Sequence, residues 1–239
     1  MNPRRCFDLA PGRVLAKNYQ VEAQLGRGYE GEVYLVHERL TGARRAAKLF
    51  YPERNEKNAA ATHYAQKLER LRDCSMVIQY HHAEQVRLRG ELVSVLISEF
   101  VEGQLLPTLL AGYRARRMPV HEALCLTRTI AAGLAEIHEK REYHGDLHAH
   151  NVLVRRRGVH FDVKLVDMYD RGRANRFHIQ QDVCDVVRIL YDLVGGRAYY
   201  AAQPPVVKRI CLGLKCTLIT QRYPTAWHLC RHLDTFDWA

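Results

Sequence analysis

The sequence predicts an α+β protein with a β-rich first part and a mainly helical second part. Residues 19 to 49 alternate short β-branched and aromatic runs with glycine-containing turns, which is typical of strands. Residues 121 to 140 and 182 to 194 carry apolar side chains at helical spacing. A chain of 239 residues is long enough to form two small lobes. We place the boundary between the lobes near residues 101 to 104.

The first part contains two clear strand candidates, VYLVHE and ARRAAKLF, which a turn at Thr41-Gly42 connects. Residues 53 to 72 are rich in Ala, Glu, Lys and Leu and contain neither Gly nor Pro, so we expect a helix there. The segment VRLRGELVSVLISEF predicts a hairpin whose second strand is strongly apolar. The domain organisation that follows is an N-terminal extension over residues 1 to 13 and a first lobe over residues 14 to 101.

The second lobe is predicted over residues 102 to 239. Besides the two helices already named, residues 205 to 215 and 225 to 233 have helical patterns, which Tyr223-Pro224 separates. An apolar run at Val152-Leu153-Val154 predicts a short strand.

The composition restricts the class of protein. The formal net charge is +10, but the basic residues are scattered and not interleaved with aromatic residues. We therefore expect phosphate-bearing ligands or acidic partners rather than nucleic acid. The chain has no membrane-length apolar run and no secretory signal, and its seven cysteines form no C-x-x-C pair. These features predict a cytoplasmic protein and leave export into another cell open. They predict no oligomeric state.

A glycine-rich segment, LGRGYEGEVYLV, places Gly26, Gly28 and Gly31 ahead of Val33. A dinucleotide-binding site would require a helix directly after such glycines, but here a β-branched and aromatic run follows. The loop therefore connects two strands. Glycines in such a loop let backbone N–H groups approach phosphates closely, because no Cβ stands in the way.

Lys48 follows Ala46 and Ala47 within an apolar strand. A buried lysine is costly without an anionic partner, so we expect Lys48 to anchor phosphate, although a solvent-facing lysine on an edge strand is the alternative.

The segment HGDLHAHNVLV, residues 144 to 154, has three interpretations. Its histidines could ligate zinc or form an exposed loop, but no nearby cysteine completes a zinc site. The third interpretation is the catalytic loop of a phosphotransferase. It requires partners elsewhere in the chain, and the glycine loop, Lys48 and the strand end at Glu99 and Val101 meet that requirement.

These motifs together resemble the protein kinase family, most closely the compact eukaryotic-like Ser/Thr kinases of bacteria. The similarity runs from about residue 14 to residue 236 in the family's order: glycine loop, strand lysine, hinge, catalytic loop, metal-binding aspartate and helical tail. It implies a bilobal fold with a small β-rich N-lobe and a larger helical C-lobe. It also implies that the protein uses ATP and Mg²⁺.

The resemblance assigns roles to individual residues. Asp146 would be the catalytic base, with Lys48 and Asn151 also catalytic. Asn151 and Asp167 would bind Mg²⁺, which prefers carboxylate and amide oxygens. Asp182 would brace the catalytic loop. The expected nucleotide-binding residues are Gly26, Gly28, Gly31, Val33, Ala46, Lys48, Glu99 and Val101, with Leu153 under the adenine and Asp167 at the metal.

The chain departs from the family at four points. Gly145 replaces the arginine that receives an activation-loop phosphate, and His148 replaces a lysine two residues after the base. Only 14 residues separate Asp167 from Asp182, so the usual peptide-binding segment is missing. The metal motif ends in Tyr169 rather than glycine. The helical glutamate that the resemblance implies as the partner of Lys48 is not evident either, because Tyr64 stands near its position, so Glu69, or less favourably Glu56, would have to serve.

Three functions follow from these features. The first is a minimal Ser/Thr protein kinase that transfers the γ-phosphate of ATP to a protein hydroxyl. The second is a kinase-fold enzyme acting on a small molecule or sugar, which His148 and the missing peptide platform favour. The third is a nucleotide-binding pseudokinase. The expected partners are ATP and a protein substrate, and neither a membrane nor nucleic acid is expected.

Overall fold

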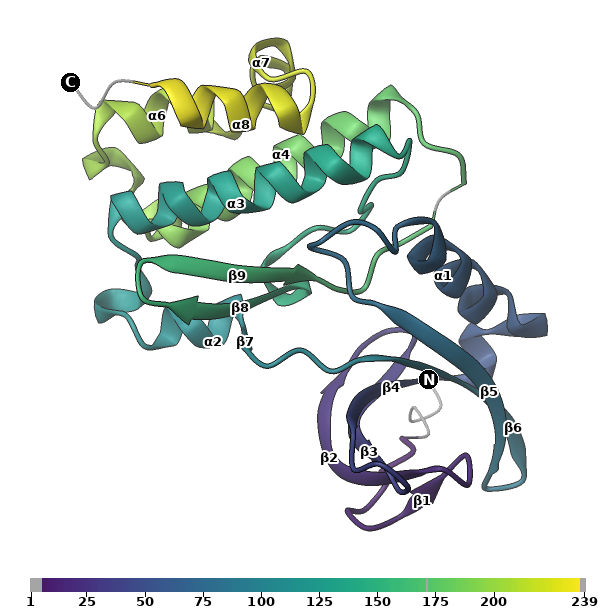
Figure 1. Ribbon diagram of the computed structural model, residues 1–239. Helices are drawn as coiled ribbons and strands as arrows, with labels where there is room; N and C mark the ends of the chain where they lie inside the picture. The colour runs from purple at the N-terminus through teal and green to yellow at the C-terminus, as the bar shows by residue number, and fades with distance from the viewer. Residues whose placement is uncertain (1–5, 171, 237–239) are drawn as a thin grey trace. The chain divides into compact units, whose positions relative to one another are not determined.

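The computed structural model describes residues 6–170 and 172–236 (Figure 1). The chain divides into two compact units, one formed by Met1–Arg72 with Ile78–Val101 and the other by Asp73–Val77 with Glu102–Ala239. The change from β to α after Val101 therefore coincides with a boundary between units. The sequence did not indicate that Asp73–Val77 belongs to the second unit. The predicted extension over residues 1–13 lies partly outside the described residues.

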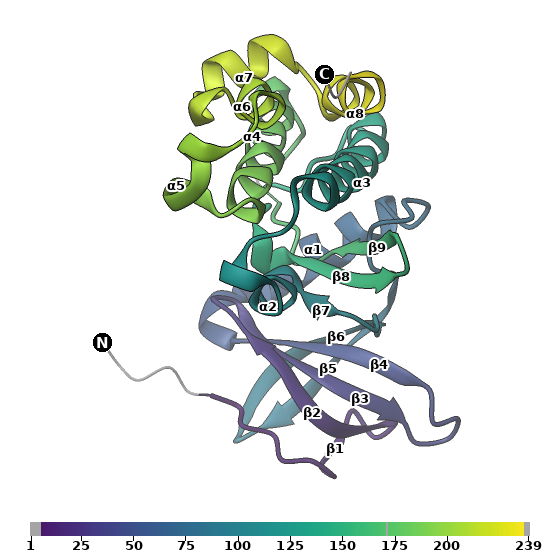
Figure 2. The ribbon, with the colours of Figure 1, turned by 90° about the vertical axis from the view of Figure 1, so that its left-hand side faces the viewer.

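The first unit is built on a six-stranded antiparallel sheet (Figure 2). Its strands occur in the spatial order β1-β2-β3-β4-β6-β5. They are β1 (Val14–Leu15), β2 (Tyr19–Arg27), β3 (Gly31–Glu38), β4 (Arg44–Phe50), β5 (Tyr80–Leu88) and β6 (Glu91–Glu99). The predicted strands and the predicted hairpin are thus confirmed.

The helix predicted over residues 53 to 72 begins later than expected. Two 3₁₀ turns, η1 (Pro52–Arg54) and η2 (Glu56–Asn58), precede α1 (Ala59–Arg70). Lys57 and Asn58 adopt left-handed backbone angles, with φ of 51° and 63°, which a continuous helix does not allow. The buried Asn55 side chain accepts from the Ala61 N–H at 3.0 Å and donates to Ser94 at 2.9 Å. These two bonds attach the start of α1 to β6.

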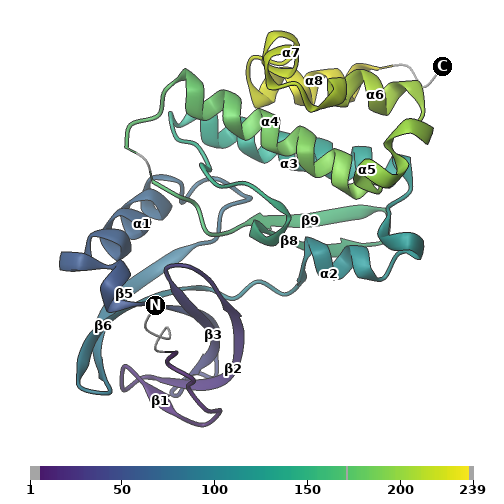
Figure 3. The ribbon, with the colours of Figure 1, turned by 180° about the vertical axis from the view of Figure 1, so that it is seen from behind.

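The second unit combines a small sheet, ordered β7-β8-β9, with a set of helices. Figures 1 and 3 show α4 alongside α3, and α8 also packs on α3. The sheet strands are β7 (Gln104–Leu105), β8 (Val152–Arg157) and β9 (His160–Leu165). The helices are α2 (Leu106–Ala111), η3 (Arg114–Arg116), α3 (Val120–Glu139), η4 (Ala149–Asn151), α4 (Arg176–Leu193), α5 (Gly196–Tyr199), η5 (Tyr200–Ala202), α6 (Pro205–Cys211), η6 (Leu212–Leu214), α7 (Cys216–Arg222) and α8 (Ala226–Thr235).

Two helix predictions in this unit need correction. The helix predicted from residue 182 begins at Arg176, because Asn175 caps it by accepting from the His178 N–H at 3.0 Å. The helix predicted over residues 205 to 215 ends at Cys211, because Leu212 is left-handed with a φ of 48°. Helix α7 follows it and was not predicted. Within residues 6–170 and 172–236, no helix is both long and apolar enough to cross a bilayer.

Candidate active site

Val33, Ala46 and Lys48 lie on one face of the sheet in the first unit. Val33 pairs with Lys48 across β3 and β4, and Leu35 pairs with Ala46. Their neighbours along the strands are fully buried in the core of this unit: Tyr34, Val36, Ala47 and Leu49. Because side chains alternate between the two faces of a strand, the predicted nucleotide residues share the other, partly exposed face. The structure therefore brings these three residues together.

The three glycines of this segment, Gly26 near the end of β2, Gly28 in the turn and Gly31 at the start of β3, have different surroundings. A Cβ on Gly31 would lie only 1.8 Å from the Leu49 carbonyl oxygen, so this glycine is required by the packing of the loop on β4. Gly26 and Gly28 have no atom within 4 Å of such a Cβ, and their backbones are not left-handed. The fold itself thus explains Gly31, but it does not explain Gly26 or Gly28.

Lys48 has a different partner from either glutamate that the sequence suggested. Its Nζ lies 2.9 Å from Oε2 of Glu30, which is part of the glycine loop. Glu69 instead pairs with Arg72 at 3.1 Å on the surface of α1. Tyr64, at the position where a helical carboxylate was sought, places its ring 4.4 Å from Lys48 Nζ. Sequence analysis missed Glu30 because the search was confined to the helix.

The two predicted hinge residues lie at the end of the first unit. Glu99 closes β6, where its N–H donates to the Gln79 carbonyl at 2.9 Å and its carboxylate accepts from the Gln79 N–H at 3.1 Å. Val101 is the last residue of that unit. Leu153 lies in the second unit, half-buried on β8 opposite Leu105.

In the second unit, Asp182 on α4 holds the start of the predicted catalytic loop. Its fully buried carboxylate accepts from the N–H groups of His144 at 2.7 Å and Gly145 at 3.0 Å. His138 Nε2 lies 3.1 Å from the same carboxylate. Burial opposes ionisation, but the hydrogen bonds from His138 and from the Gly145 N–H, together with the electrostatic effect of the two neighbouring histidines, hold the pKa of Asp182 below its usual value. Asp182 therefore braces the loop as a carboxylate, and His138 is a participant that the sequence did not indicate.

Gly145 is required by the backbone of this loop. Its φ of +83° is left-handed, and a Cβ there would lie 2.8 Å from the Tyr169 carbonyl oxygen and 2.9 Å from the Tyr143 ring. An L-residue with a side chain is strained in this conformation even without the contacts. The local backbone therefore excludes an arginine at this position, which the family normally has.

Asp146 and His148 are the exposed side chains of this part of the loop, and they lie beside the buried Asn151. The Asp146 side chain is 55% exposed and lies 3.6 Å from the His148 ring. The Asn151 amide nitrogen donates to the Asp146 carbonyl at 2.8 Å and lies 3.3 Å from His148 Nε2. Because the amide nitrogen makes both contacts, the amide oxygen is the atom that can serve a metal ion.

Asp167 lies in a segment that hydrogen bonds fix to the same loop. The Val166 N–H donates to the Asn151 carbonyl at 3.0 Å, and the Tyr169 N–H donates to the His144 carbonyl at 2.9 Å. Asp167 is exposed, with a φ of 54°. The predicted base and both predicted metal ligands thus occur on two cross-linked segments of one unit. A carboxylate and an amide oxygen are hard donors and fit Mg²⁺.

The histidines of this loop do not resemble a zinc site. His144 is buried, and its two ring nitrogens lie 3.1 Å from the Val166 carbonyl and 3.3 Å from the Asp146 N–H. It is therefore a packed loop histidine. His148 contacts Asn151, and His150 is exposed.

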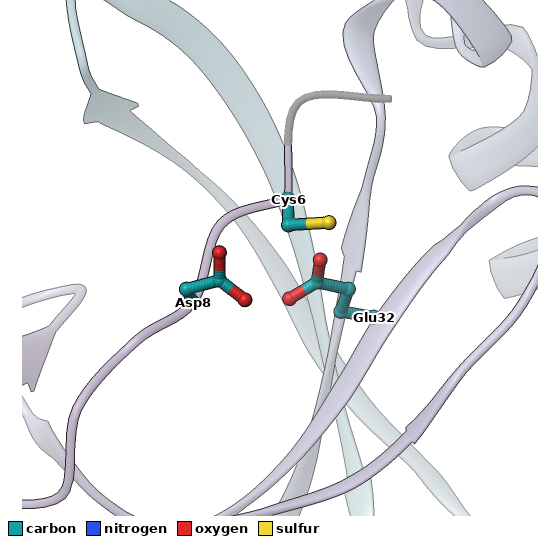
Figure 4. A group of neighbouring side chains, drawn as sticks. All are labelled: Cys6, Asp8 and Glu32. Carbon is teal, nitrogen blue, oxygen red and sulfur yellow. The ribbon is translucent and has the colours of Figure 1, made fainter. Parts of the chain in front are cut away.

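Across residues 6–170 and 172–236, one group of potential metal ligands lies close together: Cys6, Asp8 and Glu32 (Figure 4). The buried Glu32 carboxylate already accepts from the Phe7 N–H at 3.0 Å, from the Tyr51 hydroxyl at 2.9 Å and from the Tyr34 hydroxyl. Arg27 Nε adds a positive charge 3.3 Å away. A cation would have to displace these donors, so we assign the cluster a structural role: it attaches the N-terminal segment to β3.

Comparison with known families agrees with this arrangement. Residues 19–209 match the model of the protein kinase domain. The chain belongs to the protein kinase family. The match includes the glycine loop, Lys48, the catalytic loop and Asp182, and it confirms both the predicted family and the bilobal fold class.

Among curated proteins, the kinase domain is similar to bacterial Ser/Thr kinases. It is 31% identical over 164 residues to the Serine/threonine-protein kinase pkn2 of Myxococcus xanthus, covering 66% of this chain and 19% of the relative. It is 29% identical over 162 residues to PksC of Streptomyces coelicolor, covering 65% of this chain and 28% of the relative. The chain thus spans less than a third of each of these relatives.

A solved structure supports the fold. The crystal structure of a double mutant of the PknI kinase domain of Mycobacterium tuberculosis aligns with a TM-score of 0.71 at 17% identity. The alignment covers 95% of this chain and 98% of the other.

Proposed function

We propose that this kinase domain is an active phosphotransferase that transfers the γ-phosphate of Mg-ATP to a Ser or Thr hydroxyl of a protein. The observation that carries the proposal is the braced catalytic loop. Asp182 fixes the backbone at His144 and Gly145, which holds the exposed Asp146 at a defined position next to them. An exposed carboxylate on a rigid loop can accept the proton of an incoming hydroxyl.

The remaining residues have supporting roles in this proposal. Lys48 anchors the phosphates, and the backbone at Gly26 and Gly28 approaches them. Asn151 and Asp167 hold Mg²⁺, which neutralises charge on the phosphates when it is bound. Phosphoryl transfer depends mainly on such positioning and charge neutralisation, and these residues can provide both.

His148 favours one alternative, a kinase-fold enzyme that acts on a small-molecule hydroxyl. Its ring lies 3.6 Å from the Asp146 carboxylate and contacts Asn151, so it is close enough to the proposed base to contact a bound acceptor. The link from β9 to α4, residues 166 to 175, is also short. His148 and the short link affect which hydroxyl compound can be the acceptor, and the proposed binding of Mg-ATP is the same in both functions.

The test is a transfer assay with radiolabelled ATP and Mg²⁺. Mixed protein acceptors such as casein and histones are compared with a panel of sugars, amino alcohols and aminoglycosides. We expect label on serine or threonine of protein. Label confined to a small molecule would favour the alternative, and ATP binding without transfer to any acceptor would indicate a pseudokinase.

A further inference from the structure

The glycine loop carries a negative charge at the place where the proposed function requires it to receive phosphate. Glu30 is the acidic residue of the loop segment from Gly26 to Gly31. Its Oε2 lies 2.9 Å from Lys48 Nζ, and the two side chains are only 28% and 11% exposed. A pair that is this well shielded from solvent is screened less than a surface ion pair.

The backbone of the loop is held in the conformation that makes this pair. The Glu30 carbonyl accepts from the Tyr51 N–H at 2.8 Å, and the Gly28 N–H donates to the Gly31 carbonyl at 2.9 Å. The Arg54 guanidinium lies 4.1 Å from the centre of the Tyr29 ring and donates to its hydroxyl. Hydrogen bonds thus hold the backbone around Glu30, and Arg54 contacts the neighbouring Tyr29 side chain.

Aromatic rings of this unit also lie close to Lys48, but they do not neutralise its positive charge. The rings of Tyr64 and Phe50 lie 4.4 Å and 5.1 Å from Nζ, and such rings attract a cation without neutralising it. On α1, Glu69 is directed to Arg72. The Glu30 carboxylate, 2.9 Å from Nζ, thus contacts the ammonium group that the proposed function gives to a phosphate.

We propose that Glu30 is an intramolecular competitor for the phosphates of the nucleotide, and so a residue that sets affinity and selectivity at this site. The inference rests on the proposed function, in which Lys48 anchors phosphate. Two anionic groups beside one ammonium repel each other, so ATP binding requires the Glu30 carboxylate to leave Lys48. The competition lowers the affinity for ligands that carry phosphate and leaves the affinity for adenosine unchanged.

The test measures the dissociation constants of ATP with Mg²⁺ and of adenosine by calorimetry for the wild type and Glu30→Gln. The matched control is Glu53→Gln, which removes the same charge from an exposed position in η1. We expect Glu30→Gln to bind ATP about 2- to 5-fold more tightly, the range that corresponds to loss of one partly exposed ion pair, and adenosine equally well. Glu53→Gln should match the wild type for both ligands. Glu30→Ala gives the same direction of change and serves if the glutamine variant does not fold.

Weaker ATP binding by Glu30→Gln would overturn the inference and would make Glu30 a supporting partner of Lys48. Equal ATP binding would also overturn it. If neither protein binds ATP or adenosine, the proposed function fails, and tripolyphosphate then decides about Glu30 separately. Tighter tripolyphosphate binding by Glu30→Gln than by wild type would support the competition, and equal binding or none by either protein would refute it.

Discussion

Replacing a glycine of the glycine loop by alanine should lower the stability of the protein at Gly31 but its affinity for ATP at Gly28. In Gly31→Ala the new methyl group would lie 1.8 Å from the Leu49 carbonyl oxygen and 3.1 Å from the Phe50 Cα. Restoring ordinary contact requires β3 and β4 to separate locally by roughly 1.5 Å, which breaks the register at the Gly31–Phe50 pair. Such overpacking costs about 2 kcal/mol, or roughly 4–8 °C in Tm for a chain of this length.

Gly28→Ala is the matched control for stability and a probe of function. No atom lies within 4 Å of its added Cβ, so the free energy of unfolding should stay within about 0.5 kcal/mol of wild type. If Gly28 lets the backbone approach phosphate, however, this variant should bind ATP roughly 10-fold more weakly, because the Cβ stands in the ligand's place.

Urea unfolding followed by circular dichroism gives the first quantity, and calorimetric titration with Mg-ATP gives the second. A Gly31→Ala variant as stable as the wild type would refute the packing argument. A Gly28→Ala variant with unchanged ATP affinity would show that phosphate does not approach this part of the loop.

Three further predictions concern the second unit. Gly145→Ala should destabilise the fold by about 2 kcal/mol, and by more than Gly158→Ala, because both positions are left-handed but only Gly145 has close neighbours; urea unfolding compares them, and equal losses would contradict this reasoning. Burial, with smaller contributions from Asp182 and Asp146, raises the pKa of Asp185 to about 6. Ionised Asp185 therefore destabilises the folded state at pH 7.5, whereas ionisation costs nothing in the unfolded state. Asp185→Asn should therefore stabilise the protein by roughly 1–2 kcal/mol at pH 7.5, and the gain should shrink towards pH 5 as folded Asp185 takes up its proton; a gain that does not depend on pH would exclude this cause. Phosphatase treatment should leave the transfer rate unchanged, because Gly145 provides no guanidinium to receive a loop phosphate and only 14 residues separate Asp167 from Asp182. A large loss of transfer rate after this treatment would contradict the prediction.

Local patterns predicted much of the first unit and the positions of the motifs. The runs that contain Val33 and Lys48, with the turn at Thr41-Gly42 between them, indicated two neighbouring strands, and the glycine loop between strands was expected because a β-branched and aromatic run, not a helix, follows the glycines. The start of α1 was not predictable, because nothing in the apolar pattern of the sequence marks the left-handed backbone at Lys57 and Asn58. The first turns of α4 were missed for a similar reason, since its apolar stripe begins only near Asp182.

Contacts that depend on the path of a loop were beyond sequence reasoning. The Glu30–Lys48 pair forms because the glycine loop lies against β4, as the close approach of Gly31 to Leu49 also shows. The sequence showed that arginine is replaced at Gly145, but it did not show that the backbone there is left-handed and excludes a side chain. His138 was missed because its contact with Asp182 joins α3 to α4.

The most direct test of the central claim compares Asp146→Asn with Asp167→Asn in the transfer assay and in nucleotide binding. Asp146→Asn should keep the wild-type affinity for Mg-ATP but lose roughly 10²- to 10⁴-fold in turnover, because a positioned base is removed and no metal ligand is lost. Asp167→Asn should weaken Mg²⁺-dependent ATP binding as well, because a charged oxygen ligand is lost. If both variants transfer phosphate at the wild-type rate, the assignment of the catalytic loop is wrong.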